Sequence, residues 1–170
     1  MTIAEEPAIT PHKVPQLPSY KPPRAGVSSA SAQTSSVTGD KFRLIVVDGA
    51  NVVGARPDGW WRDRAGAAHR LLERLSYWRE ALDQPADLVV VLEGAAKAAI
   101  AGATEFHGIR VVSAAGSGDD AIVEVVAETI ARDNNLLITV VTADRGLRER
   151  VEQLGAVTVG PSWLLDRIES

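Results

Sequence analysis

Acidic side chains follow four separate apolar runs in this chain. Asp48 follows the first run and Glu93 the second, the pair Asp119 and Asp120 comes after the third, and Asp144 after the fourth. Carboxylates within a few ångströms of one another cannot all stay ionised without compensation, which a divalent cation commonly supplies. Oxygen ligands without His or Cys favour Mg²⁺ or Mn²⁺ over zinc. Such a site supports phosphoryl transfer, because the metal polarises a phosphate oxygen and lowers the pKa of a bound water.

Each of these acids also has an ordinary structural explanation. An Asp after a strand often starts a turn, and an Asp at the start of a helix often caps its free amides. Glu93 would then be a solvated loop residue. Four acidic positions on one edge are harder to explain in this way, because their charges repel. We therefore expect Asp48 and Asp144 to bind a metal directly, and Asp119 or Asp120 to hold a water or a second ion.

Polar neighbours complete the candidate site. Asn51 cannot ionise, so we expect its amide to orient a water or to contact phosphate. Thr142, two residues before Asp144, is expected to form a hydrogen bond with one of the carboxylates. The catalytic candidates are Asp48, Asn51, Asp120 and Asp144, and the metal candidates are Asp48, Glu93, Asp119, Asp120 and Asp144. The substrate-binding candidates are Asn51, Arg62, Thr142, Arg145 and Arg148.

The apolar pattern predicts the elements that position these residues. Continuous apolar runs, rather than alternating ones, indicate strands that are buried on both faces. They alternate with helical patterns, which predicts a three-layer α/β fold with a parallel sheet between helices. Ligands bind beyond the carboxyl ends of such strands, so the acids fall on one edge. The predicted strands are 42–47, 88–92, 109–112, 136–141 and 156–159; the predicted helices are 63–82, 95–103, 119–132 and two short ones after Asp144 and around Ser162; 49–62 is predicted as a loop.

Composition limits the domain organisation and the function. Residues 1–40 are rich in Pro and Ser and sparse in large apolar residues, so we predict a disordered tail before a folded domain over 41–170. The absence of Cys excludes disulfide scaffolds and thiolate chemistry. A net charge of -4 excludes a broadly basic surface for nucleic acid. With no signal-like segment or long apolar run, a cytoplasmic location is the default and no membrane partner is expected.

Three motifs carry a family resemblance. Asp48-Gly49-Ala50-Asn51 follows a predicted strand, Gly118-Asp119-Asp120 opens a predicted helix, and Thr142-Ala143-Asp144-Arg145 follows a late strand. In this order they resemble the NYN domain, a branch of the PIN-like nucleases that includes the bacterial YacP-type proteins. The resemblance covers about residues 42–160.

The resemblance implies a fold and an activity. It implies a Rossmann-like sheet of strand order 3-2-1-4-5 and Mg²⁺- or Mn²⁺-dependent cleavage of RNA, single-stranded or structured. The family's acidic ligands fall on Asp48, Asp119 or Asp120, and Asp144, and its polar partner on Asn51. Some members carry a further acid where this chain has Arg148, which favours one metal or an arginine that contacts phosphate.

Two other functions remain open at this stage. A protein with a weakened site would be a non-catalytic RNA- or protein-binding module of the same fold. The same metal site could instead hydrolyse free nucleotides. Trp60 and Trp61, with arginines around them, are candidates to stack on RNA bases. The sequence leaves the target RNA, internal or terminal cleavage and the oligomeric state open, a homodimer included.

Overall fold

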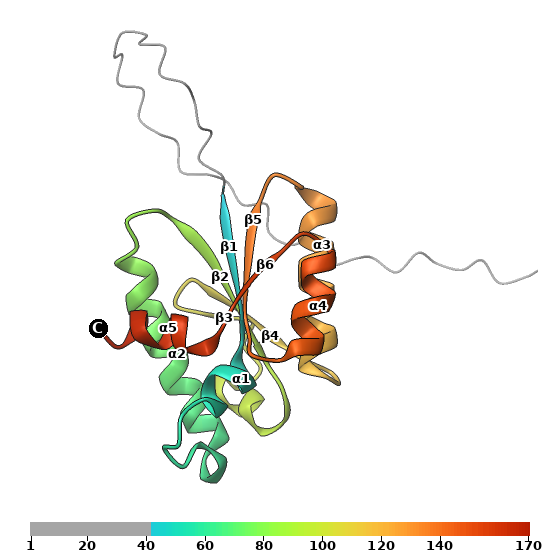
Figure 1. Ribbon diagram of the computed structural model, residues 1–170. Helices are drawn as coiled ribbons and strands as arrows, with labels where there is room; N and C mark the ends of the chain where they lie inside the picture. Colours follow the sequence, from blue (N-terminus) through green and yellow to red (C-terminus); the bar gives the residue numbers. More distant parts are fainter. Residues whose placement is uncertain (1–41) are drawn as a thin grey trace, which may run out of the picture. The chain divides into compact units, whose positions relative to one another are not determined.

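The computed structural model describes residues 42–170, so the predicted tail at 1–40 lies outside the described residues (Figure 1). The strands are β1 (Arg43–Asp48), β2 (Ala86–Leu92), β3 (Glu105–Phe106), β4 (Ile109–Ser113), β5 (Leu137–Val141) and β6 (Val157–Val159). The α-helices are α1 (Gly49–Gly54), α2 (Arg64–Glu80), α3 (Gly118–Arg132), α4 (Arg145–Gln153) and α5 (Pro161–Ile168). Two 3-10 helices, η1 (Trp60–Arg62) and η2 (Gly94–Ile100), complete the described part.

The strands form one sheet in the order β3-β4-β2-β1-β5-β6. The five predicted strands are β1, β2, β4, β5 and β6, and they stand in the order 3-2-1-4-5 with parallel pairing throughout. The added strand β3 pairs antiparallel with β4 at one edge. It has only two residues, too few for a periodic pattern. The predicted α/β class and strand order are therefore confirmed, with one extra edge strand.

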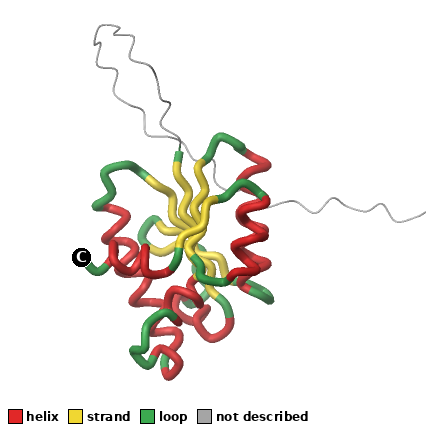
Figure 2. The backbone as a smooth tube through the Cα atoms, viewed as in Figure 1, coloured by secondary structure: helices red, strands yellow, loops and turns green. Residues whose placement is uncertain are grey.

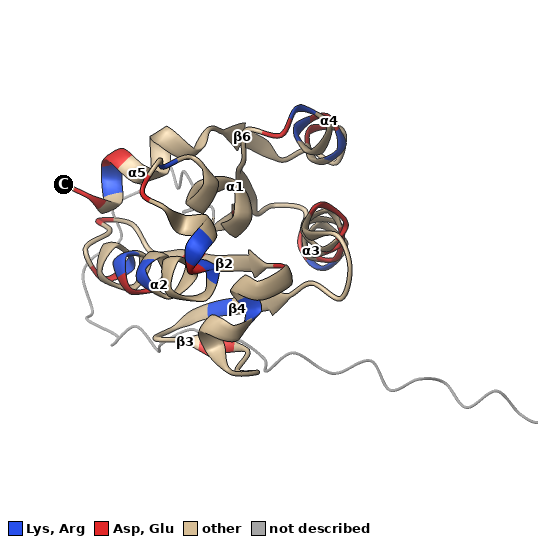
Figure 3. Cartoon of the chain, turned by 90° about the horizontal axis from the view of Figure 1, so that it is seen from below, with Lys and Arg blue, Asp and Glu red and all other residues tan. Residues whose placement is uncertain are grey.

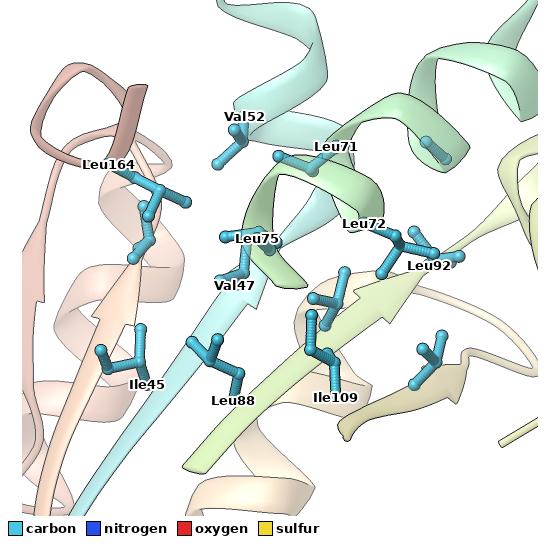
Figure 4. Packing of buried hydrophobic residues seen from close by; sticks show 14 of the residues in the cluster. Ile45, Val47, Val52, Leu71, Leu72, Leu75, Leu88, Leu92, Ile109 and Leu164 are labelled. Atoms are coloured by element: carbon cyan, nitrogen blue, oxygen red, sulfur yellow. The ribbon is translucent and has the colours of Figure 1, made fainter. Parts of the chain in front are cut away.

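Helices cover both faces of the sheet (Figures 1 and 2). Along β1 the side chains alternate, so Ile45 and Val47 pack on the face that α2 and α5 cover. Figure 4 shows these two residues beside Leu75 and other buried residues of that layer. Leu44 and Val46 pack on the opposite face, against α3 and α4. Burial on both faces explains why the strands read as continuous apolar runs, and it fixes β1 as the central strand.

Three local predictions need correction. The predicted loop 49–62 contains α1 and η1, because Asp48 caps α1 by accepting a hydrogen bond from the Asn51 amide. The predicted helix over 95–103 is the shorter 3-10 helix η2. Neither Asp119 nor Asp120 caps α3, because the Ser117 side chain accepts the hydrogen bond from the Asp120 amide. Six residues are too few to show helical periodicity, so the sequence pattern does not predict α1.

Within residues 42–170, no helix combines the length and the apolar character needed to cross a membrane.

Candidate active site

The carboxyl ends of β1, β2 and β5 meet at one edge of the sheet, because these strands are parallel neighbours. Asp48 ends β1, Glu93 follows β2, and Asp144 comes three residues after β5. The first turn of α3 adds Asp119 and Asp120. Figure 1 shows these strand ends pointing down toward α1, and Figure 3 views the chain from below, with this edge toward the reader. The predicted gathering of acids on one edge therefore follows from the observed topology.

Asp48 is a buried carboxylate, with 6% of its surface exposed. Its Oδ1 accepts a hydrogen bond from the Asn51 amide at 3.2 Å, and its Oδ2 accepts one from Thr142 Oγ1 at 2.9 Å. Burial nevertheless raises the pKa of this carboxyl, and the charges of Asp119 and Glu93 raise that pKa further. The two hydrogen bonds oppose this shift without cancelling it. The protein therefore holds Asp48 in a place where its negative charge is disfavoured.

Thr142 and Asn51 join the end of β1 to the loop after β5. The fully buried hydroxyl of Thr142 donates to Asp48 and accepts a hydrogen bond from the Asp144 amide at 3.1 Å. The side-chain oxygen of Asn51 accepts a hydrogen bond from the Ala143 amide at 2.9 Å. The predicted contact between Thr142 and a carboxylate is present. The amide oxygen of Asn51 is used to hold the loop, and no bond from its NH₂ group is found within residues 42–170.

Asp144 and Glu93 each accept a hydrogen bond from a backbone amide at the start of a helix beside the site. Asp144 Oδ1 accepts the Leu147 amide of α4 at 2.8 Å, and Glu93 Oε2 accepts the Gly118 amide of α3 at 2.6 Å. A Cβ on Gly118 would lie 2.7 Å from that Glu93 oxygen, so glycine permits this approach. The capping explanation is thus correct for Asp144. It leaves the second oxygen of each carboxylate available to a metal, so the two roles coexist.

The structure separates Asp119 from Asp120. Burial raises the pKa of Asp119, and the charges of Asp144 and Glu93 raise it further. Asp120 is exposed and its Oδ1 pairs with Arg150 Nη2 at 2.9 Å. The charge cluster at the edge therefore contains Asp119, while Asp120 forms an ion pair between α3 and α4. The expected catalytic and metal roles of Asp120 stay predictions without support from this geometry.

The predicted substrate arginines lie in different surroundings. Arg148 is half-buried, and its Nε donates to the Thr142 carbonyl at 2.9 Å, which ties α4 to the loop after β5. Arg145 is 92% exposed at its side chain and pairs with Glu149. Arg62 is exposed in η1, which lies between α1 and α2 in the chain. Contact with RNA stays a prediction for all three.

The residues present suit a largely hydrated Mg²⁺ or Mn²⁺ better than a closed protein cage. Within residues 42–170, no three His, Asp or Glu side chains stand close enough together to enclose an ion. The charges of Asp119 and Glu93 nevertheless raise the pKa of Asp48, and those of Asp144 and Glu93 raise the pKa of Asp119, so positive charge is favoured among these carboxylates. Mg²⁺ usually keeps several waters and takes only one or two protein carboxylates together with substrate phosphate. Asp48 and Asp144 are the pair on adjacent strands that can supply them.

Comparison with solved structures identifies the same architecture elsewhere. Rae1 (YacP) from Bacillus subtilis matches with a TM-score of 0.59 and 20% identity, over 74% of this chain and 73% of that chain. The chain has the fold of YacP. A single-residue mutant of Rae1 (YacP) matches with a TM-score of 0.59 and 18% identity, over 75% of this chain and 76% of that one. The predicted resemblance to the NYN and PIN-like group is thus confirmed for the fold.

Other comparisons add no further relatives. No family model matches the sequence, and no curated protein matches it. At 18–20% identity the likeness to YacP establishes the shared fold, and the chemistry must be argued from the residues.

Sequence reasoning missed Gly118 as a residue of the site. Its amide holds the Glu93 carboxylate at the edge, and its missing side chain makes room for it. The available signal was a glycine directly before an acidic pair at a helix start.

Proposed function

We propose that this protein is a metal-dependent ribonuclease that hydrolyses RNA phosphodiester bonds at the edge where Asp48 and Asp144 meet. The observation that carries the proposal is the buried carboxylate of Asp48, which lies within a cluster of acids in a chain with the YacP fold. A buried charge of this kind is unfavourable for the folded state, and such charges cluster where a ligand binds or a reaction takes place. The three motifs that resemble the NYN domain point to the same activity.

The residues of this chain have distinct roles in the proposed reaction. Asp48 and Asp144 would hold Mg²⁺ or Mn²⁺, and the bound ion would supply Lewis-acid activation of a phosphate oxygen and of water. Thr142 fixes the Asp48 carboxylate through its hydroxyl, so the ligand keeps its orientation. Asp119 holds a water near the scissile phosphate and accepts a proton from it, for which its raised pKa is suited. The NH₂ group of Asn51 donates to a phosphate oxygen.

Incubation of the purified full chain with single-stranded and structured RNA tests this proposal. We expect cleavage with Mg²⁺ or Mn²⁺, none in EDTA, and a loss of at least about 100-fold in Asp48→Asn and in Asp144→Asn. Asp166→Asn is the matched control, because this acid is exposed on α5 at a distance from the sheet edge. Cleavage that persists in EDTA, or that Asp48→Asn leaves intact, contradicts the proposal.

A second candidate function is an RNA-binding module without catalysis. Arg148 favours it, because this residue stands where some NYN proteins have a further acid and here serves a structural tie. Isothermal titration separates the two functions. RNA binding without any binding of Mn²⁺ at millimolar concentration supports the module, whereas Mn²⁺ binding that Asp48→Asn abolishes supports the nuclease.

Hydrolysis of free nucleotides at the same site is the remaining alternative. The same metal chemistry serves any phosphate ester, so the acids alone do not choose between substrates. Turnover of a nucleotide panel, with none of RNA, would replace the ribonuclease proposal.

A further inference from the structure

A hollow lies between α1, α2 and α5, apart from the acidic edge. Its floor is apolar and includes Val52 and Leu71, while three arginines and one acid, Asp58, line it. Arg56 comes from the loop after α1, and Arg70 and Arg74 come from successive turns of α2. Because Arg70 and Arg74 lie four residues apart on a helix, their side chains leave the same face.

The charged side chains around the hollow form a site that can bind an anion. The carboxylate of Glu169 forms ion pairs with both Arg56 and Arg74, with 3.1 Å between Arg74 Nη1 and Glu169 Oε1. One carboxylate therefore occupies the space between two guanidinium groups. Arginine presents its donors in a planar fork that fits carboxylate and phosphate oxygens alike. Glu169 shows that the geometry accepts an oxyanion.

Hydrogen-bond donors remain at the hollow after Glu169 is counted. The Nε of Arg56 is buried and has no hydrogen-bond partner within residues 42–170. Arg70 is exposed and forms no ion pair with the described residues. A buried donor without an acceptor is unusual in folded proteins and indicates a missing ligand or water. The site thus offers more donors than one carboxylate can satisfy.

The hollow is also placed where a bound strand can reach it. The helix α1 begins directly after Asp48 and has six residues, so it spans roughly 9 Å at 1.5 Å per residue. Arg56 follows two residues after its end. A single strand with one phosphate at the acidic edge can therefore continue along α1 toward the arginines. The acidic edge repels the remaining phosphates, so a separate basic contact is needed to hold the strand.

We propose that Arg56, Arg70 and Arg74 bind neighbouring backbone phosphates of the RNA substrate, and that Glu169 occupies part of this site until RNA displaces it. The inference rests on the proposed function for its choice of ligand. The side chains of the displaced ion pairs are only partly exposed, at 31–46%, but the phosphate takes the place of the carboxylate between the arginines, so little charge pairing is lost. These three arginines, which we call the anchor, then hold the RNA strand at a second point in addition to the metal site.

Binding of a labelled single-stranded oligoribonucleotide in EDTA tests the anchor, because no cleavage takes place there. We expect Arg70→Ala to weaken binding about fivefold, since a charged contact to phosphate is lost. Glu169→Gln should strengthen binding about threefold, because it frees Arg56 and Arg74 from their internal anion. A DNA oligonucleotide of the same sequence should lose the same factor in Arg70→Ala, since the contact is to phosphate.

The ion pair of Arg132 and Glu128 on α3 supplies matched controls. Arg132→Ala and Glu128→Gln change the same charges outside the hollow, so both should leave RNA affinity unchanged. Circular dichroism and thermal unfolding confirm that each variant is folded. The anchor is overturned if the wild-type chain binds no RNA in EDTA, or if Arg70→Ala and Glu169→Gln match the controls. The two proposals can fail separately. If RNA is bound but not cleaved, the nuclease proposal fails and the anchor stands, and Asp48→Asn should still bind RNA.

Discussion

The position of Asp48 at the end of the central strand is unfavourable for its negative charge. A buried carboxylate loses hydration, and here Asp119 and Glu93 add repulsion, so the pKa of Asp48 rises in spite of two hydrogen bonds. A raised carboxyl pKa means that the protonated form fits the folded state better than the ionised form. The contribution of Asp48 to the free energy of unfolding is therefore fully present below the pKa that this carboxyl has in the unfolded chain. It is lost as the pH rises through the higher pKa of the folded state.

Asp48→Asn should accordingly stabilise the protein at neutral pH in the absence of metal. Asparagine keeps the shape and removes the buried charge, so we expect the melting temperature at pH 7.5 to rise by a few degrees. The gain should shrink as the pH falls through the raised pKa of Asp48, because the carboxyl becomes protonated in the wild-type chain as well. Thermal unfolding of both proteins in EDTA across this pH range measures the difference.

Asp133→Asn is a suitable control for that series, since this exposed acid lies at the far end of α3. It should show no gain that depends on pH in this way. A wild-type chain that is more stable than Asp48→Asn at pH 7.5 in EDTA contradicts the reasoning on Asp48.

Thr142 offers a second test at the residue scale. Thr142→Val keeps the volume but leaves Asp48 Oδ2 and the Asp144 amide without their partner, so we expect a loss of about 2 kcal/mol or more in unfolding free energy. Thr142→Ser keeps the hydroxyl and removes one buried methyl, at a cost of about 1 kcal/mol. Urea unfolding compares the two. Equal losses would show that the hydroxyl contributes nothing and that only packing matters.

At the scale of elements, the pattern of the strands could be predicted because burial on both faces leaves a direct trace in the sequence. The runs within β1 and β2 are apolar without a break over 44–47 and 88–92, the run of β5 is interrupted only by Thr139, and each ends where an acid or a turn follows. The order of the strands required the family resemblance. The short elements were beyond reach, because β3 has two residues and α1 has six, and neither spans enough chain to show a period.

The candidate site shows where sequence reasoning stops. Parallel strands bring Asp48, Glu93 and Asp144 to one edge, so topology alone predicts their gathering. The choice between Asp119 and Asp120 depends on Arg150, which lies on another helix and pairs with Asp120. The arginine hollow depends on the packing of α5 against α1 and α2. Contacts between elements distant in the sequence leave no local pattern, which is why neither feature was predicted.

The junction between β1 and α1 is a testable element-scale feature. A Cβ on Gly49 would lie 2.7 Å from the Val91 carbonyl oxygen and 2.9 Å from Leu92 Cδ2, so α1 starts in close contact with β2. We expect Gly49→Ala to lower the unfolding free energy by about 1–3 kcal/mol, because backbone must move. Gly116→Ala is the control, since nothing lies within 4 Å of its Cβ position. It should change stability by less than about 0.5 kcal/mol. Equal effects in urea unfolding would contradict the close packing.

At the scale of the whole molecule, charge limits how RNA is held. The chain carries 22 acidic and 18 basic side chains. Four of the acids, Asp48, Glu93, Asp119 and Asp144, gather at the proposed catalytic edge. Binding then depends on a few local arginines and on the metal, rather than on a basic surface. Each phosphate that an arginine neutralises on a single strand releases counterions, so the number of such contacts appears in the salt dependence of binding.

The salt dependence of RNA binding is therefore expected to be shallow. Two or three phosphate contacts at about 0.7 each give a slope between roughly -1.4 and -2.1 in a plot of log K against log of the NaCl concentration. Fluorescence anisotropy in EDTA between about 50 and 200 mM NaCl measures it. Arg70→Ala should bring the slope closer to zero by about 0.7, while Arg132→Ala leaves it unchanged. A slope steeper than about -4 would require about six or more phosphate contacts at about 0.7 each, and thus a broad basic face in place of the local anchor.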